Sequence, residues 1–169
     1  MKTLIIHPTD PSTDFLSVIY EDTDWTVIRE IGSKSSLIKN IQSHEHIIMM
    51  GHGSAQGLFD ILNSRMVIDS TFVFVLREKQ CTYIWCNADE FVQKYSLKGM
   101  YTGMVISELE EAINYCVRPK DDEIECSNTM FATAVKQALK HIDPVFKFKQ
   151  LYEGEGEVFE FNRERFYYE

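Results

Sequence analysis

Two apolar segments of the sequence end in residues that could form a thiol–imidazole pair. Residues 47–51 (IIMMG) run into His52, and residues 82–85 (TYIW) run into Cys86. Each pattern is typical of a buried parallel strand that presents its last residue at an open edge of a sheet. If the two strands are neighbours, a base lies beside a thiol, which is the arrangement for nucleophilic attack on a carbonyl.

The surroundings expected for Cys86 would activate its thiol. A thiol has an ordinary pKa of about 8.5, and a helix N-terminus or a nearby imidazolium lowers it. Asn87 is suited to begin a helix directly after Cys86, so both influences are expected here. The backbone N–H groups of Gly53 and Cys86 could bind an oxyanion, because both residues lie in expected tight turns. Taken singly, however, a histidine at a strand end is more often structural and a lone cysteine is more often a core residue.

Strands alternate with helices along the chain. Strands are expected over residues 3–7, 25–31, 46–51, 81–86 and 99–106, with a sixth strand from Val145 to Phe148. Helices are expected between them and over a longer stretch that begins at Ser127-Asn128. This order predicts an α/β fold, a three-layer α/β/α sandwich around a mostly parallel six-stranded sheet. Sites in such sheets lie beyond the C-terminal ends of the strands, where His52, Cys86 and Ser107 fall.

The length and composition indicate one domain over residues 1–169. The chain is 44% hydrophobic and 25% charged, an ordinary balance for a globular domain. A small hairpin is expected over residues 57–68, beside His52. The aromatic C-terminal tail, residues 153–169, is expected to dock on the domain or on a protein partner.

Charge and cysteine spacing exclude several classes of function. The net charge of −9, with no basic patch, argues against nucleic acid and anionic membranes as partners. No apolar run could span a bilayer and no secretory signal precedes the first strand, so a cytoplasmic location is expected. The four cysteines lack C-x-x-C spacing, and His44 and His46 are expected to be solvent-exposed histidines, so we expect no metal site. Residues 51–53 lack the third glycine of a dinucleotide fingerprint, and no cofactor is expected.

The apolar runs into His52-Gly53 and into Cys86, in this order, resemble the two catalytic blocks of the caspase/gingipain/legumain group of cysteine peptidases (clan CD). The similarity covers roughly the first five expected strands, and Trp85 stands where many members carry alanine. The resemblance implies a caspase-like fold, Cys86 as nucleophile, His52 as general base and acid, and a peptide or protein substrate. It also implies a carboxylate in the pocket for the residue before the scissile bond, selecting a basic side chain.

Several residues could contribute to substrate binding. Asp10, Asp89 and Glu108 are candidates for the selecting carboxylate because each lies just past an expected strand end, as Ser107 does. Acidic residues are also common in the first turn of a helix, which is the plainer explanation of all three.

Two other functions remain open. A catalytically silent module for protein interaction would keep the peptidase-like fold, and the acidic surface, Trp85 and the aromatic tail favour it. A flavodoxin-like domain would bind a small anionic ligand at the edge formed by the first and third strands, although the sequence offers little phosphate-binding signal.

Overall fold

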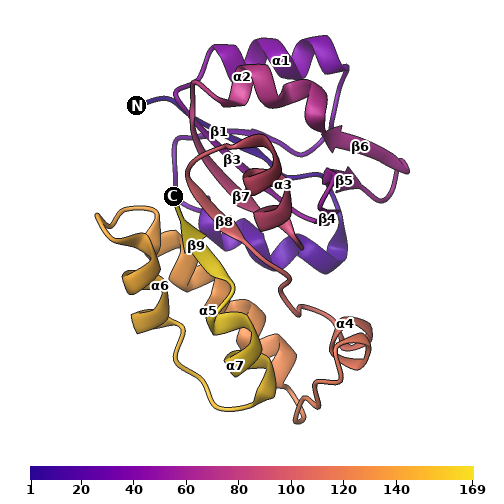
Figure 1. Cartoon of the computed structure of the whole chain (residues 1–169), viewed down its shortest axis with the longest axis vertical. Helices are drawn as coiled ribbons and strands as arrows, with labels where there is room; N and C mark the ends of the chain where they lie inside the picture. The colour runs from indigo at the N-terminus through magenta and orange to yellow at the C-terminus, as the bar shows by residue number, and fades with distance from the viewer.

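A six-stranded sheet forms the centre of the computed structural model, which describes all 169 residues (Figure 1). Its order is β2-β1-β3-β7-β8-β9. The strands are β1 (Thr3–Ile6), β2 (Thr26–Ile28), β3 (His46–Met50), β7 (Gln80–Ile84), β8 (Met100–Thr102) and β9 (Phe166–Tyr168). β1, β2, β3, β7 and β8 run parallel to one another, whereas β9 runs antiparallel to β8. The predicted α/β class is confirmed, and the predicted mostly parallel sheet is corrected to a mixed sheet.

The predicted sixth strand at residues 145–148 is wrong, because this segment is helix α6 (Pro144–Leu151). Asp143 caps the helix by accepting the Phe146 backbone N–H at 3.0 Å, and Pro144 occupies the first turn, where its missing N–H costs nothing. Phe148 is fully buried while Phe146 is 59% exposed. The sixth strand is instead supplied by the C-terminal tail.

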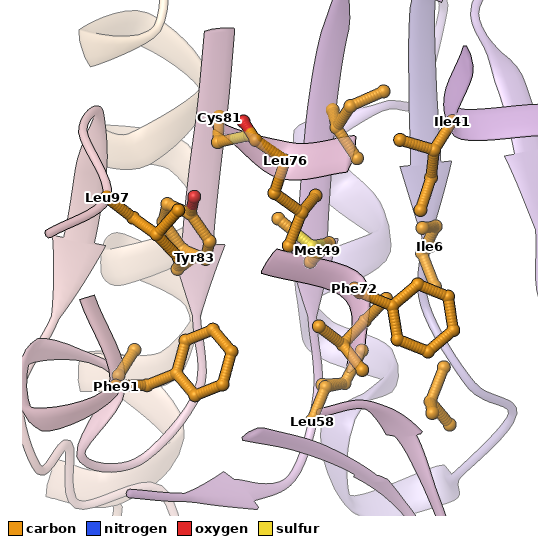
Figure 2. Packing of buried hydrophobic residues seen from close by; sticks show 14 of the residues in the cluster. Ile6, Ile41, Met49, Leu58, Phe72, Leu76, Cys81, Tyr83, Phe91 and Leu97 are labelled. Carbon is orange, nitrogen blue, oxygen red and sulfur yellow. The ribbon is translucent and has the colours of Figure 1, made fainter. Parts of the chain in front are cut away.

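Helices cover both faces of the sheet (Figure 1). One face carries α1 (Lys34–Gln42), η2 (Ser70–Phe72), α2 (Val73–Leu76) and α3 (Ala88–Tyr95). The other face carries η1 (Pro11–Ile19), α5 (Glu123–Ala138), α6 and α7 (Glu157–Arg163). Figure 2 shows the first of these cores, where side chains of the strands meet those of the covering helices.

Side chains alternate strictly between the two cores along each central strand. In β3, Ile47 and Met49 join the core of the α1 face, whereas Ile48 and Met50 join the core of the α5 face. This period of two is that of a strand buried on both sides, and it explains the unbroken apolar runs in the sequence.

A second, three-stranded sheet follows β3 and contains the predicted hairpin. It is made of β4 (Gly53–Ser54), β5 (Gly57–Asp60) and β6 (Arg65–Ile68), all antiparallel. The short helix α4 (Leu109–Asn114) lies between β8 and α5 in the chain. No helix has the length and apolar character needed to cross a membrane.

The C-terminal tail packs on the domain. Phe166 of β9 stacks on Phe148 with ring centroids 4.3 Å apart, and Phe148 stacks in turn on Tyr152.

Helix α5 begins at Glu123, four residues before the predicted start. Glu123 is buried, and its carboxylate is compensated by accepting the backbone N–H groups of Lys120 and Val158.

Removal of the α6 cap provides a test of the corrected assignment. We expect Asp143→Ala to lower the free energy of unfolding by about 1 kcal/mol, because one N-terminal N–H of α6 loses its acceptor. Urea denaturation measures this loss as a lower midpoint at unchanged slope. Asp121→Ala, at an exposed aspartate outside any helix, is the control and should leave the midpoint unchanged. Equal stability of Asp143→Ala and the wild type would contradict a capped helix at this position.

Candidate functional site

The pairing of β3 with β7 places His52 and Cys86 near each other. Met50 pairs with Ile84, and both belong to the core of the α5 face. His52 and Cys86 each follow two residues later, just beyond the ends of β3 and β7. They line one cavity of about 30 Å³ at the C-terminal edge of the sheet, together with Gly51, Ser107 and others. This cavity has room for about one water-sized group.

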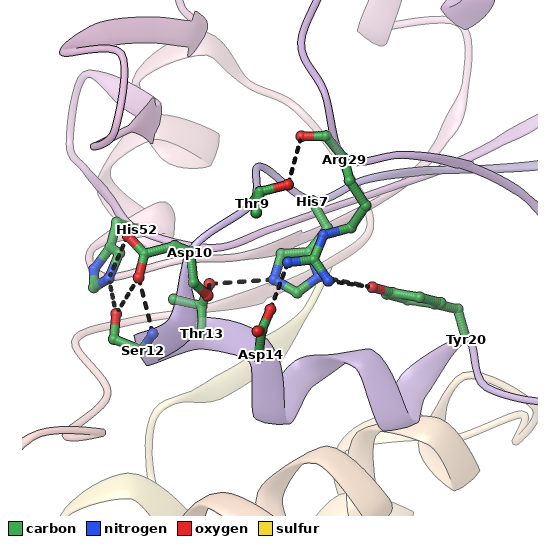
Figure 3. Close-up of polar contacts among 9 residues, drawn as sticks. All are labelled: His7, Thr9, Asp10, Ser12, Thr13, Asp14, Tyr20, Arg29 and His52. Atoms are coloured by element: carbon green, nitrogen blue, oxygen red, sulfur yellow. Dashed lines mark hydrogen bonds and ion pairs between the residues drawn. The ribbon is translucent and has the colours of Figure 1, made fainter.

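The His52 ring forms a hydrogen bond with the segment after β1 and none with Cys86 (Figure 3). Its Nε2 lies 2.6 Å from Ser12 Oγ and 3.8 Å from Asp10 Oδ2. Ser12 Oγ donates to Asp10 Oδ1 at 2.8 Å. Asp10 is the N-cap of η1, so the start of this helix holds the acid and the hydroxyl beside the imidazole.

The Cys86 thiol contacts two acceptors from the segment between β8 and the first turn of α4. Its Sγ lies 3.5 Å from the Val105 carbonyl oxygen and 3.6 Å from Glu111 Oε1. Glu111 is held firmly, since its Oε2 accepts the backbone N–H groups of Ser107 and Glu108 and the Ser107 hydroxyl. The thiol thus rests against a fixed carboxylate at the start of α4.

These contacts do not activate the Cys86 thiol, contrary to the expectation from the sequence. Burial, and next the negative charge of Glu111, raise the pKa of Cys86 to about 12. Helix α3 does follow directly, but Asn87 adopts a left-handed conformation and makes no side-chain cap. Desolvation and a like charge therefore outweigh the helix N-terminus, and the thiol is protonated at neutral pH.

Trp85 lies on the opposite face of the sheet from Cys86. Its indole is 2% exposed, packs edge-on against Tyr83 and Phe91, and donates from Nε1 to the Ser54 carbonyl oxygen at 3.1 Å. Gly53 permits this packing, because a Cβ at that position would lie 2.3 Å from the indole. The glycine proposed as an oxyanion donor is therefore also required for the fit of Trp85.

Of the four weaker candidates for substrate binding, the structure places two near the cavity and two outside it. Asp10 reaches the His52 ring, and Ser107 lines the cavity. Glu108 caps α4 and does not line the cavity. Asp89 also lies outside the cavity and instead helps to raise the pKa of the Tyr101 hydroxyl, mainly a result of burial and the nearby Glu169. Asp89 is thus not brought to the cavity, whereas the charge of Glu108 acts on Cys86 from outside it and helps to raise the pKa of the thiol.

Two residues of the site were missed from the sequence. Ser12 lies two residues after Asp10, the N-cap of η1. This spacing could have indicated that its side chain lies at the same edge of the sheet as His52. Glu111 is the third helical residue of α4, so its side chain folds back on the cap. Residues 107–110 (SELE) also fit the sequence pattern of a capping box, one residue before the actual one, and this competing pattern hides the role of Glu111.

His46 was expected to be exposed and is instead 3% exposed. It begins β3 inside the sheet, its Nε2 lies 3.2 Å from Thr82 Oγ1, and burial lowers its pKa to about 4. No group of three or more His, Cys, Asp or Glu side chains is arranged to hold a metal ion.

A larger hollow lies beside the small cavity. Its volume is about 680 Å³, and Ser12, Phe15, Leu109 and Asn128 line it together with the acidic residues Asp121, Asp122 and Glu125. Ser12 both lines this hollow and contacts His52, and the hollow is large enough for a side chain of a peptide.

No family model matches this chain, and no curated protein sequence is significantly similar to it. The site holds a partly exposed imidazole and a protonated thiol that line one small cavity, with a larger hollow beside them.

Proposed function

We propose that the chain is a cysteine hydrolase of peptide bonds with a caspase-like fold. The observation that supports this most is that His52 and Cys86, which follow two adjacent parallel strands, line the same cavity at the edge where sites form. The adjoining hollow offers space for a peptide side chain.

In the proposed reaction the thiol proton passes to His52 and the sulfur attacks the peptide carbonyl carbon. The amine leaves with a proton from His52, and water then hydrolyses the thioester. The thiol first has to turn from Glu111 to His52, so we assign the described arrangement to a resting form. Substrate binding beside α4 is the step that would free the thiol.

Cleavage of a peptide library, followed by mass spectrometry, tests the proposal. We expect the wild type to cleave, Cys86→Ala to be inactive, and His52→Ala to be slower by about 100-fold or more, because the thiol loses its base. Cys126→Ser, at an exposed cysteine, is the control and should keep full activity. Cleavage that persists in Cys86→Ala would contradict the proposal.

A non-catalytic interaction module is the second candidate. The contact between Cys86 and Glu111 favours it, as do the exposed apolar residues Leu109, Ile113 and Tyr115 of the α4 region. In this case neither the wild type nor Glu111→Gln cleaves any peptide. A binding partner would then remain bound to Cys86→Ala and be lost by Ile113→Asp.

A further inference from the structure

The Ser12 hydroxyl joins the Asp10 carboxylate to the His52 ring (Figure 3). Asp10 is fixed, since its Oδ1 also accepts the Ser12 backbone N–H at 2.9 Å. The three side chains therefore form a continuous series of hydrogen bonds that ends at one defined atom of the imidazole, Nε2.

Counting protons assigns the direction of each hydrogen bond. Ser12 has one hydroxyl proton, and an ionised carboxylate can only accept. The hydroxyl proton therefore goes to Asp10, and the proton between Ser12 and His52 comes from Nε2. A neutral His52 then has a free lone pair on Nδ1, since the ring's one hydrogen bond to the protein is made through Nε2.

His7, which follows β1 next to β3, shows the opposite arrangement. Its Nδ1 lies 3.1 Å from the Tyr20 hydroxyl and its Nε2 lies 3.2 Å from Thr13 Oγ1, so both ring nitrogens are engaged. His7 is also fully buried. Of the two histidines that follow these neighbouring strands, only His52 keeps a nitrogen free to accept a proton.

We propose that Asp10 and Ser12 are positioning residues that fix the Nε2-protonated form of His52, so that Nδ1 is the atom that receives the Cys86 proton. This inference depends on the function proposed above. The S–H bond breaks, an N–H bond forms at Nδ1, and the ring becomes an imidazolium. Its positive charge is then stabilised through Nε2 by the Ser12 hydroxyl and by Asp10, whose Oδ2 is 3.8 Å away.

The protonation of the ring can be measured without any substrate. Nitrogen-15 NMR of the His52 ring at pH 8 is expected to show Nε2 protonated and Nδ1 unprotonated, in a single form. In Ser12→Ala the two nitrogen shifts should move toward those of a free imidazole, which is a mixture of both forms. Ser12→Thr keeps the hydroxyl and should restore the wild-type shifts. A proton on Nδ1 in the wild type, or unchanged shifts in Ser12→Ala, would overturn the assignment.

Kinetics separate this inference from the proposed function. Ser12→Ala and Asp10→Asn are expected to lower kcat for peptide cleavage on the order of ten-fold at little change in KM, and Ser12→Thr should recover most of it. Cleavage that is unaffected by Ser12→Ala contradicts the positioning role while the hydrolase remains. The expected ring shifts without any cleavage contradict the hydrolase while the assignment of the ring protons stands.

Discussion

The Glu111→Gln variant is expected to react with iodoacetamide at Cys86 about ten times faster than the wild type at pH 8. A like charge a few ångströms away shifts a pKa by one unit or more, and the thiolate is the reacting species. Removing the charge therefore lowers the pKa of Cys86 from about 12 and raises its thiolate fraction. Glutamine keeps an oxygen that can accept the backbone N–H groups at the start of α4, so this helix should remain capped.

The measurement follows the rate of alkylation at Cys86 by mass spectrometry. Cys116 and Cys126 are exposed and are replaced by serine in every protein compared, while buried Cys81, with its pKa raised to about 11, reacts slowly. Glu110→Gln, at the exposed neighbouring residue, is the matched control and should not change the rate. Equal rates in Glu111→Gln and Glu110→Gln would show that the carboxylate does not hold the thiol protonated.

Acidification is expected to destabilise the protein through its buried histidines. The pKa of His46 is about 4 in the folded chain and about 6.5 when unfolded. Between these values the unfolded chain binds a proton that the folded chain does not, so stability is complete above pH 6.5 and falls as the pH drops toward 4. At about 1.4 kcal/mol per pH unit, His46 alone accounts for a loss of about 2–3 kcal/mol by pH 4.5.

Urea denaturation at pH 7.5 and pH 4.5 measures this loss. His46→Gln removes the titrating group, so its stability should fall by about 2–3 kcal/mol less than that of the wild type over the same interval. His141→Gln, at an exposed histidine, should behave as the wild type does. Identical pH dependence in the wild type and His46→Gln would exclude His46 as a source of acid sensitivity. His7, whose pKa is also lowered to about 4 by burial and by the charge of Arg29, should add a separate loss.

Strand positions were predictable because burial on both faces leaves a simple pattern. The run before His52 has no polar side chain and the run before Cys86 has only Thr82, and the structure assigns alternate apolar residues to the two cores. The same pattern misled the assignment of Val145 to Phe148, where three large apolar side chains suggested a strand. The Asp143-Pro144 start of that segment was the better local signal, since it satisfies the first turn of a helix.

The partners of the two candidate residues could not be predicted in the same way. Which acid faces Cys86 depends on where β8 ends and how α4 folds back, a contact that spans 25 residues of sequence. Ser12 reaches His52 across 40 residues, through the packing of η1 against the sheet edge. Such contacts are set by tertiary packing, and a single sequence records them only as ordinary helix-start residues.

The packing of Trp85 gives the chain an optical probe of its own site. Only one other tryptophan, Trp25, is present, and Trp85 donates its indole N–H to Ser54, two residues after His52. Displacement of the loop that carries His52 would change the polarity around a buried fluorophore. Its emission spectrum therefore reports on the position of this loop with no label attached.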